Sequence, residues 1–223
     1  MIDGPIEAVG FDLDETLIVP DRDRDDLLAD ACEAVGIDPI DSEAYLAAHD
    51  ATPADVISRT REPIFERLHP EAADAIADAY CSVMADAVCL VPSARVAIEA
   101  VHDRGLAVGI CTDGPVRAQR AKLDAVGLSG VADATLITGS IDARKPDPTV
   151  YDRLTDRLEV APANTLFVGD GPENDVAGAA AAGLRAVQVR TDAPIHPEAD
   201  AVVDRSALDD AIETLLSPTS DKM

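Results

Sequence analysis

The sequence has no tryptophan, few other aromatic residues and few basic ones. Aromatic residues make up 3% of its 223 residues, so aliphatic side chains must fill most of the core. Lysine and arginine together number 18 against 43 acidic residues, which gives a formal net charge of −25. Because a chain this acidic repels the phosphate backbone of nucleic acids and anionic membrane surfaces, we expect neither as a partner.

Several other features are absent, and each excludes a class of protein. No apolar run approaches the ~20 residues that a membrane-spanning helix needs. The N-terminal residues lack the basic segment and apolar run of a secretory signal, so we expect a cytoplasmic protein. The four cysteines include no CxxC pair, which favours buried thiols. No GxGxxG motif follows the first predicted strand, which disfavours a dinucleotide-dependent dehydrogenase.

The acidic residues are spread along the whole chain. Only three lysines are present, and this Asp-rich, Lys-poor composition resembles that of proteins from salt-loving cells. High salt screens the repulsion between like charges, since the Debye length falls to ~3 Å near 1 M salt. We therefore expect a halophilic protein rather than an ordinary acidic one. The composition gives no indication of oligomeric state.

Predicted strands and helices alternate over most of the chain. Short apolar runs bounded by turn residues indicate strands at residues 6–11, 106–111, 134–137, 165–169, 185–189 and 201–203. Helical patterns lie at 93–104, 115–126, 148–158, 174–182 and 206–216, and we expect Ser93 and Ser206 to cap the first and last of them. This alternation predicts an α/β fold with a doubly wound, mostly parallel sheet, in which ligands bind beyond the carboxyl ends of the strands.

Residues 18–91 interrupt the alternation with helical patterns at 25–36, 53–68 and 71–90 and no convincing strand. We expect a small all-helical cap domain there, inserted into a core domain that comprises residues 1–17 and 92–217. Residues 218–223 are expected to form a flexible tail. Three arginines of the insertion either reach an anionic substrate or form a solvated helix face, namely Arg59, Arg61 and Arg67.

Two aspartates, Asp12 and Asp14, follow the first predicted strand. Carboxylates this close together repel each other unless a cation or a proton lies between them. A hard divalent cation, which prefers oxygen ligands, would relieve that repulsion. One carboxylate can also attack phosphorus as a nucleophile, and the other can transfer protons to and from the reacting groups.

Polar residues also lie beyond three later predicted strands. Thr112 and Asp113 stand at the start of a helix, where a hydroxyl group and backbone N–H groups can hold phosphate oxygens. Lys145 lies between turn-forming residues, and its ammonium group is a compact partner for a phosphoryl dianion. Asp170 follows another strand, and Asp175 lies on the helix after it.

These four segments, in this order, resemble the motifs of the haloacid dehalogenase superfamily, in its phosphatase type with a helical cap inserted after the first motif. The matching segments are residues 12–16, 112–113, 145–148 and 169–175. The resemblance implies a Rossmann-like core in which Asp12 is the nucleophile and Asp14 the general acid and base. It also implies phosphate binding by Thr112, Asp113 and Lys145, and Mg²⁺ binding by Asp12, Asp14, Asp170 and Asp175. Asp113 stands where many relatives carry asparagine.

The resemblance implies a magnesium-dependent phosphomonoester hydrolase that acts on a small phosphorylated metabolite through an aspartyl-phosphate. Asp14 would need a pKa above the ~3.9 of free aspartate to act as an acid near neutral pH. Asp14 disfavours a haloacid dehalogenase, which lacks this carboxylate, and the absence of lysine from residues 18–91 disfavours a phosphonate-cleaving relative. A phosphomutase with the same core residues and a non-catalytic phosphate-binding protein stay open as alternatives.

Overall fold

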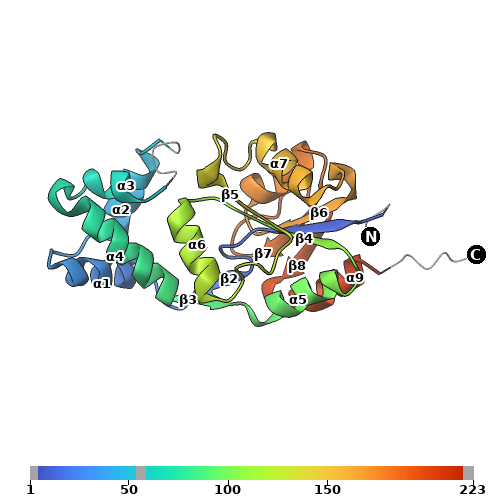
Figure 1. Ribbon diagram of the computed structural model, residues 1–223, viewed down its shortest axis with the longest axis horizontal. Coiled ribbons are helices and arrows are strands. Elements are labelled where there is room, and N and C mark those ends of the chain that lie inside the picture. The colour runs from blue at the N-terminus through green and yellow to red at the C-terminus, as the bar shows by residue number, and fades with distance from the viewer. Residues whose placement is uncertain (1–4, 54–58, 218–223) are drawn as a thin grey trace, which may run out of the picture.

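Six parallel strands form the central sheet of the computed structural model, which describes residues 5–53 and 59–217 (Figure 1). The strand order is β5-β4-β1-β6-β7-β8, and every neighbouring pair is parallel. The strands are β1 Ala8–Phe11, β4 Ala107–Thr112, β5 Ala134–Ile137, β6 Thr165–Gly169, β7 Arg185–Arg190 and β8 Ala201–Asp204. The predicted α/β fold with a parallel sheet is confirmed. The tail predicted at 218–223 lies outside the described residues.

Helices cover both faces of this sheet, as Figure 1 shows. On one face, α5 Pro92–His102 and α9 Leu208–Leu215 pack on side chains such as Phe11 and Val168, and α6 Val116–Ala125 adds Leu123 to the same core. On the other face, α7 Pro148–Leu158 and α8 Gly178–Ala181 pack on Phe167 and its neighbours. Successive residues of a strand point to opposite faces, so each buried strand contributes side chains to both apolar cores.

Strand β1 lies between β4 and β6, and Gly10 allows α7 to approach it closely. A Cβ atom at Gly10 would lie 2.9 Å from both Leu154 Cδ2 and Phe167 Cδ2, which is closer than carbon atoms pack. Because β1 is central, the residue that follows it emerges in the middle of the carboxyl edge of the sheet. That residue is Asp12.

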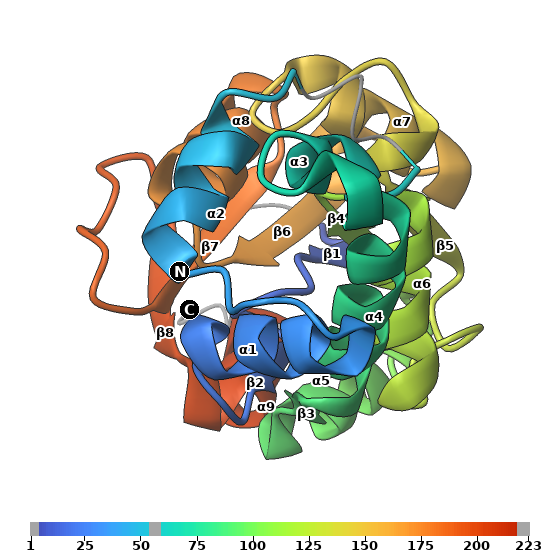
Figure 2. The same ribbon diagram turned by 90° about the vertical axis from the view of Figure 1, so that its left-hand side faces the viewer.

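The inserted segment forms a helical group with its own apolar cluster, built around Tyr45, Phe65 and Tyr80. Its helices are α1 Arg24–Val35, α2 Ser42–Asp50, α3 Glu62–Glu66 and α4 Ala73–Asp86. Figure 2 shows these helices in front of the carboxyl edge of the sheet. Nowhere in the described ranges does a helix have both the length and the apolar character needed to cross a membrane.

The structure differs from the expectations about the insertion in three places. Two short strands, β2 Ile18–Pro20 and β3 Val88–Leu90, pair antiparallel where no strand was expected, and three residues are too few for an alternation pattern to reveal. Helix α2, which Asp41 caps by accepting a hydrogen bond from the Ala44 N–H, was not predicted. The helix expected at 53–68 is described only at Glu62–Glu66, and its residues 54–58 lie outside the described ranges.

Neither predicted serine cap is present. Ser93 Oγ instead donates a hydrogen bond of 2.7 Å to the Arg205 carbonyl, and α5 begins at Pro92, whose fixed φ suits the first turn of a helix. Ser206 lies inside a one-turn helix that precedes α9, and no side chain caps α9. The single helix expected at 174–182 is a π-helical stretch, Pro172–Ala177, followed by α8.

Candidate active site

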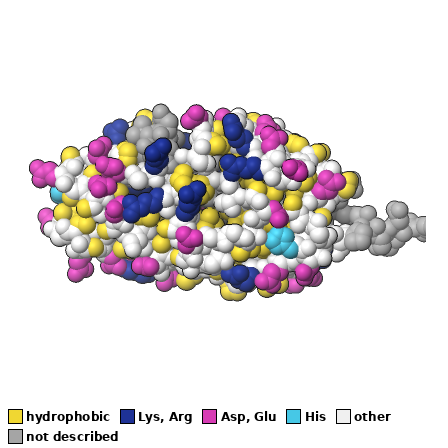
Figure 3. All heavy atoms as spheres, viewed as in Figure 1, with side chains coloured by type: hydrophobic (Ala, Val, Ile, Leu, Met, Phe, Trp, Pro, Cys, Tyr) yellow, Lys and Arg dark blue, Asp and Glu magenta, His cyan; other side chains and the backbone are white. Residues whose placement is uncertain are grey.

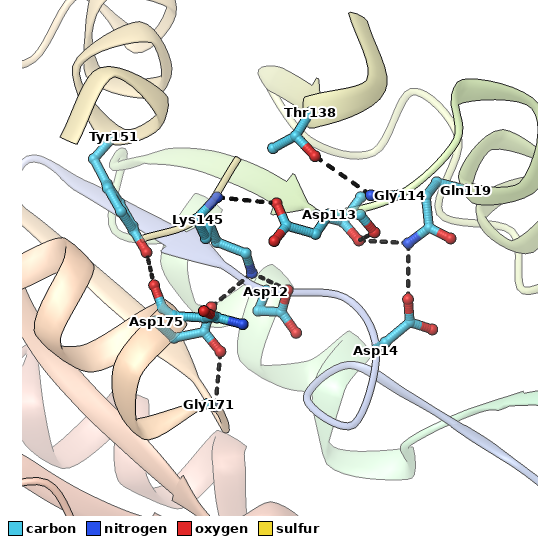
Figure 4. Close-up of polar contacts among 12 residues, drawn as sticks. Asp12, Asp14, Asp113, Gly114, Gln119, Thr138, Lys145, Tyr151, Gly171 and Asp175 are labelled. Carbon is cyan, nitrogen blue, oxygen red and sulfur yellow. Dashed lines mark hydrogen bonds and ion pairs between the residues drawn. The ribbon is translucent and has the colours of Figure 1, made fainter. Parts of the chain in front are cut away.

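The loops that follow β1, β4, β5 and β6 meet at the carboxyl edge of the sheet (Figure 4). They bring together predicted site residues that are up to 163 positions apart in the sequence, from Asp12 to Asp175. Four of these side chains are buried, those of Asp12, Thr112, Lys145 and Asp175. Buried polar side chains need partners, so their contacts define what the site can do.

The Lys145 ammonium group bridges two buried carboxylates. Its Nζ lies 2.5 Å from Asp12 Oδ1 and 2.6 Å from Asp175 Oδ1. Burial alone would lower the pKa of Lys145, but the charges of Asp12 and Asp175 outweigh burial and raise this pKa well above its usual value. Lys145 therefore stays charged, with one more carboxylate beside it than it can neutralise.

Asp12, Asp170 and Asp175 form a compact acidic group, whose ligand oxygens lie within 4.8 Å of one another. Burial raises the pKa of Asp12 well above its usual value, and the charge of Asp175 adds to this effect while Lys145 opposes it. Burial and the charge of Asp175 also raise the pKa of Asp170 to about 6. Ionising all three carboxylates at once is therefore unfavourable unless a cation lies between them. Three carboxylates with this strain fit a hard divalent ion such as Mg²⁺.

The position of Asp175 depends on a glycine at the end of β6. A Cβ atom at Gly169 would lie 2.4 Å from Asp175 Cγ, so only glycine leaves room for this carboxyl group. Asp175 Oδ2 accepts a hydrogen bond of 2.8 Å from the Gly171 N–H. The Tyr151 hydroxyl group donates to the Asn174 carbonyl and holds the same turn. The turn therefore fixes the acid before any ligand arrives.

Asp14 does not join the acidic group. Its Oδ1 lies 2.7 Å from Lys122 Nζ, and its Oδ2 accepts a hydrogen bond of 2.7 Å from Gln119 Nε2. Burial would raise the pKa of Asp14, but Lys122 and the Gln119 hydrogen bond outweigh burial and lower it. A role as a general acid requires a raised pKa, so the shift in the pKa of Asp14 is opposite to the one required. The Asp14 side chain is 43% exposed, whereas its partner Lys122 is 4% exposed.

Strand β4 ends at Thr112, Asp113 follows it, and the two side chains have different hydrogen-bond partners. Thr112 Oγ1 accepts a hydrogen bond of 2.5 Å from Gln119 Nε2. The Asp113 carboxylate accepts a hydrogen bond of 3.2 Å from the backbone N–H of Lys145. Asp113 thus ties the Lys145 loop to β4, and Thr112 is the hydroxyl group at the centre of the site.

Gln119 and Lys122 are the two site residues that the sequence did not indicate. Both lie on α6 and are buried. A signal was present for Lys122, because lysine is so rare in this chain. No pattern in the sequence linked α6 to the loop that carries Asp14.

The three arginines of the insertion have different environments. Arg67 donates to Thr52 Oγ1 at 2.9 Å and to the Ala51 carbonyl at 2.8 Å, and so stabilises the insertion itself. The Arg61 guanidinium lies 5.8 Å from the centre of the Tyr80 ring, and its positive charge helps to lower the pKa of Asp14. Its Nη1 atom is buried, with no hydrogen-bond partner among the described residues.

Arg59 lies at a separate cavity of about 800 Å³, between the insertion and the outer side of α6. Two arginines of α6, Arg117 and Arg120, line the same cavity, and none of the acidic group does. Figure 3 shows basic side chains gathered across the middle of this face of the molecule. The cavity is therefore distinct from the candidate active site.

Comparisons with known proteins agree with this arrangement. A family model described as haloacid dehalogenase-like hydrolase matches residues 6–183. A ribulose-1,5-bisphosphate 5-phosphatase of Halopiger xanaduensis is 31% identical, over 93% of this chain and 95% of that enzyme. A phosphoserine phosphatase of Thermus thermophilus is 38% identical over 49% of this chain, and the match spans 43% of that enzyme.

A solved structure resembles nearly the whole chain. The haloacid dehalogenase (HAD) phosphatase of Thermococcus onnurineus superimposes with a TM-score of 0.69 and 23% identity, over 95% of this chain and 98% of that one. At this identity the match supports the fold alone.

Proposed function

The chain belongs to the haloacid dehalogenase-like hydrolase family, and we propose that it is a magnesium-dependent phosphatase that acts on a small phosphorylated metabolite through an aspartyl-phosphate. One observation carries the proposal. Asp12 lies buried at the end of the central strand, with the ammonium group of Lys145 at 2.5 Å and two further carboxylates beside it. This arrangement suits a nucleophile that must approach a phosphoryl dianion.

In the first step, Asp12 Oδ2 forms a bond to phosphorus while the ester P–O bond breaks and the alcohol departs. Lys145 binds Asp12 Oδ1, which orients the attacking oxygen and balances charge near the phosphoryl group. The hydroxyl group of Thr112 donates to a phosphoryl oxygen. Asp12, Asp170 and Asp175 would hold Mg²⁺, which would supply positive charge near the phosphoryl group.

In the second step, water attacks phosphorus, the bond to Asp12 breaks, and Asp14 takes the proton that the water loses. Asp14 serves the two steps unequally. Its ion pair with Lys122 favours the carboxylate that removes a proton from water, and disfavours the acid that protonates the departing alcohol in the first step. The first step therefore depends on the bound dianion, whose charge raises the pKa of Asp14.

The charges near Asp14 support a substrate that carries a second anionic group. The buried Nη1 atom of Arg61, which lacks a partner among the described residues, suits a second anionic group on the substrate. The names of the relatives, which include a sugar bisphosphate phosphatase and a phosphoserine phosphatase, agree with a metabolite that carries such a group. We also propose a cytoplasmic enzyme of a salt-loving cell; the net charge of −25, whose self-repulsion high salt would screen, supports the salt-loving part.

The proposal is tested by measuring inorganic phosphate released from a panel of phosphomonoesters in high KCl, with and without Mg²⁺. The panel includes ribulose-1,5-bisphosphate and phosphoserine. Release that requires Mg²⁺ and is lost in Asp12→Asn supports the proposal. A folded protein that releases no phosphate from any ester contradicts it, and isomerisation of a sugar phosphate without net release identifies a mutase instead.

A further inference from the structure

Helix α6 presents two buried polar residues, Gln119 and Lys122, to the loop after β1 (Figure 4 shows Gln119 and Asp14). Residues three apart lie on the same face of a helix. The neighbouring position Arg120 is exposed on the outer side of α6. The inner face of α6 is thus polar where it meets Asp14 and Thr112.

Lys122 is buried at a cost in free energy. Its side chain is 4% exposed, and its Nζ lies 2.7 Å from Asp14 Oδ1. Removing an ammonium group from water is costly, and an apolar side chain of similar size would fill the same space without that cost. Both lysines that the structure describes are buried in this manner, Lys145 beside Asp12 and Lys122 beside Asp14.

Gln119 joins Asp14 to Thr112 through a single nitrogen atom. Its Nε2 donates to Asp14 Oδ2 at 2.7 Å and to Thr112 Oγ1 at 2.5 Å. A flipped amide would direct its oxygen at the Asp14 carboxylate, so the amide orientation follows from this contact. Because Thr112 Oγ1 accepts from Gln119, its own hydrogen is free to donate, and in this structure it donates only a long hydrogen bond of 3.5 Å to the Asp113 carbonyl. A phosphoryl oxygen at the site would be a better acceptor for that hydrogen.

The surroundings of Gln119 support its importance. A Cβ atom at Gly114 would lie 3.3 Å from both Gln119 Cγ and Gln119 Cδ, and Gly114 has a φ of +134°, so glycine is needed for this packing. The Gln119 Oε1 atom is buried without a hydrogen-bond partner among the described residues. An orphaned buried oxygen costs free energy, so packing alone gives no reason to retain an amide here.

We propose that Lys122 and Gln119 are positioning residues: together they fix the Asp14 carboxylate through both of its oxygens, and Gln119 also directs the Thr112 hydroxyl hydrogen toward the phosphoryl group. The proposal rests on the phosphatase function proposed above. Lys122 acts only through Asp14, whereas Gln119 acts through both Asp14 and Thr112. The two residues therefore have different kinetic signatures, since Asp14 moves protons and Thr112 binds phosphate.

The experiment compares kcat and KM of Lys122→Met and Gln119→Met with those of the wild type, using the best ester of the panel with Mg²⁺ in high KCl. We expect Lys122→Met to lower kcat by about tenfold to a hundredfold with little change in KM, the usual loss when a group that orients a catalytic residue is removed. Gln119→Met should lower kcat and also raise KM. The matched control is Arg120→Met on the exposed side of α6, which should leave both constants unchanged.

A double-mutant cycle separates positioning from a general structural role. In an Asp14→Asn background, measured in single turnovers, Lys122→Met should have almost no further effect, because its partner is already gone. An equal loss in both backgrounds overturns the proposal, as does a Lys122→Met enzyme with wild-type kcat. If Lys122→Met does not fold, Gln119→Met tests the proposal. A lower kcat together with a higher KM supports it, and unchanged constants overturn it. A wild type that releases no phosphate contradicts the phosphatase function itself, which is a separate outcome.

Discussion

Lys145 Nζ lies 2.5 Å from Asp12 Oδ1, which places the ammonium group against the residue that we propose as nucleophile. The same nitrogen lies 2.6 Å from Asp175 Oδ1. One cation therefore holds together two carboxylates that would otherwise repel each other in a buried space. The integrity of the site and its chemistry depend on the same side chain.

Replacing this lysine should harm both stability and turnover. We expect Lys145→Met to lower the free energy of unfolding without metal by about 3 kcal/mol, because breaking a buried ion pair leaves an uncompensated charge. The loss of kcat should reach at least about a hundredfold. Urea unfolding and phosphate release measure the two effects. The double variant Asp12→Asn/Lys145→Met should be more stable than Lys145→Met alone, and a less stable double variant would contradict this account.

The raised pKa of Asp170 predicts a pH dependence of stability in the metal-free protein. Its pKa of about 6 exceeds the ~3.9 of free aspartate, so the folded state holds this proton more tightly and stability falls as pH rises from about 4 to about 6. Asp170→Asn removes the effect. Above pH 6 this variant should be more stable than the wild type by about 1 kcal/mol, once solvent screening of this partly exposed group is allowed for.

Thermal unfolding between pH 4 and pH 8 tests this difference. Below pH 4 the two proteins should have similar stability. Excess Mg²⁺ provides the control, because it should stabilise the wild type and have less effect on Asp170→Asn. A difference that does not change with pH, or a variant less stable than the wild type at pH 7 without metal, would show that Asp170 is not strained.

Arg61 should select substrates that carry a second anionic group. Arg61→Leu should raise KM for ribulose-1,5-bisphosphate about tenfold or more, the worth of a hydrogen bond to a charged group, and change KM for an aryl phosphate much less. The control is Arg67→Leu, which removes contacts inside the insertion and should lower stability while leaving the ratio of the two KM values unchanged. Equal effects of Arg61→Leu on both esters would rule out direct recognition.

The acidity of the chain predicts stabilisation by salt. Raising KCl from 0.1 M to 2 M should increase the free energy of unfolding by about 2 kcal/mol, or roughly 4–8 °C in Tm, because screening weakens the self-repulsion of a net charge of −25. Calorimetry in KCl and in an uncharged solute of equal osmolality separates screening from solvent exclusion. A protein equally stable at both KCl concentrations would refute the halophilic interpretation.

The sequence predicted the core of the site because parallel strands place their carboxyl ends at one edge. Once Asp12, Thr112 and Asp170 were each assigned to the end of a strand, the geometry of the sheet required them to meet. Lys145 follows the same logic, since it lies on the connection that leaves β5. These residues could be located without any knowledge of side-chain contacts.

The contacts of α6 could not be predicted in this manner. Helical periodicity places Gln119 and Lys122 on one face, but it does not say what that face meets. Lys122 pairs with a residue 108 positions earlier in the chain, through a packing arrangement that only the three-dimensional fold determines. The direction of the Asp14 pKa shift was missed for the same reason, because it depends on Lys122.

The ribbon of β2 and β3 has a mechanical consequence for this ion pair. Strands β2 and β3 are the two segments that connect the insertion to the sheet. Because they are hydrogen-bonded to each other, we call them a two-stranded tether and expect them to bend together. The tether begins where the Asp14 loop ends, since the Glu15 N–H donates to the Ile18 carbonyl at 2.9 Å. Any rocking of the inserted helices on this tether would pull on the Asp14 loop, while Lys122 stays anchored on α6. The distance between the Asp14 carboxylate and the Lys122 ammonium group would therefore change with the position of the insertion relative to the sheet.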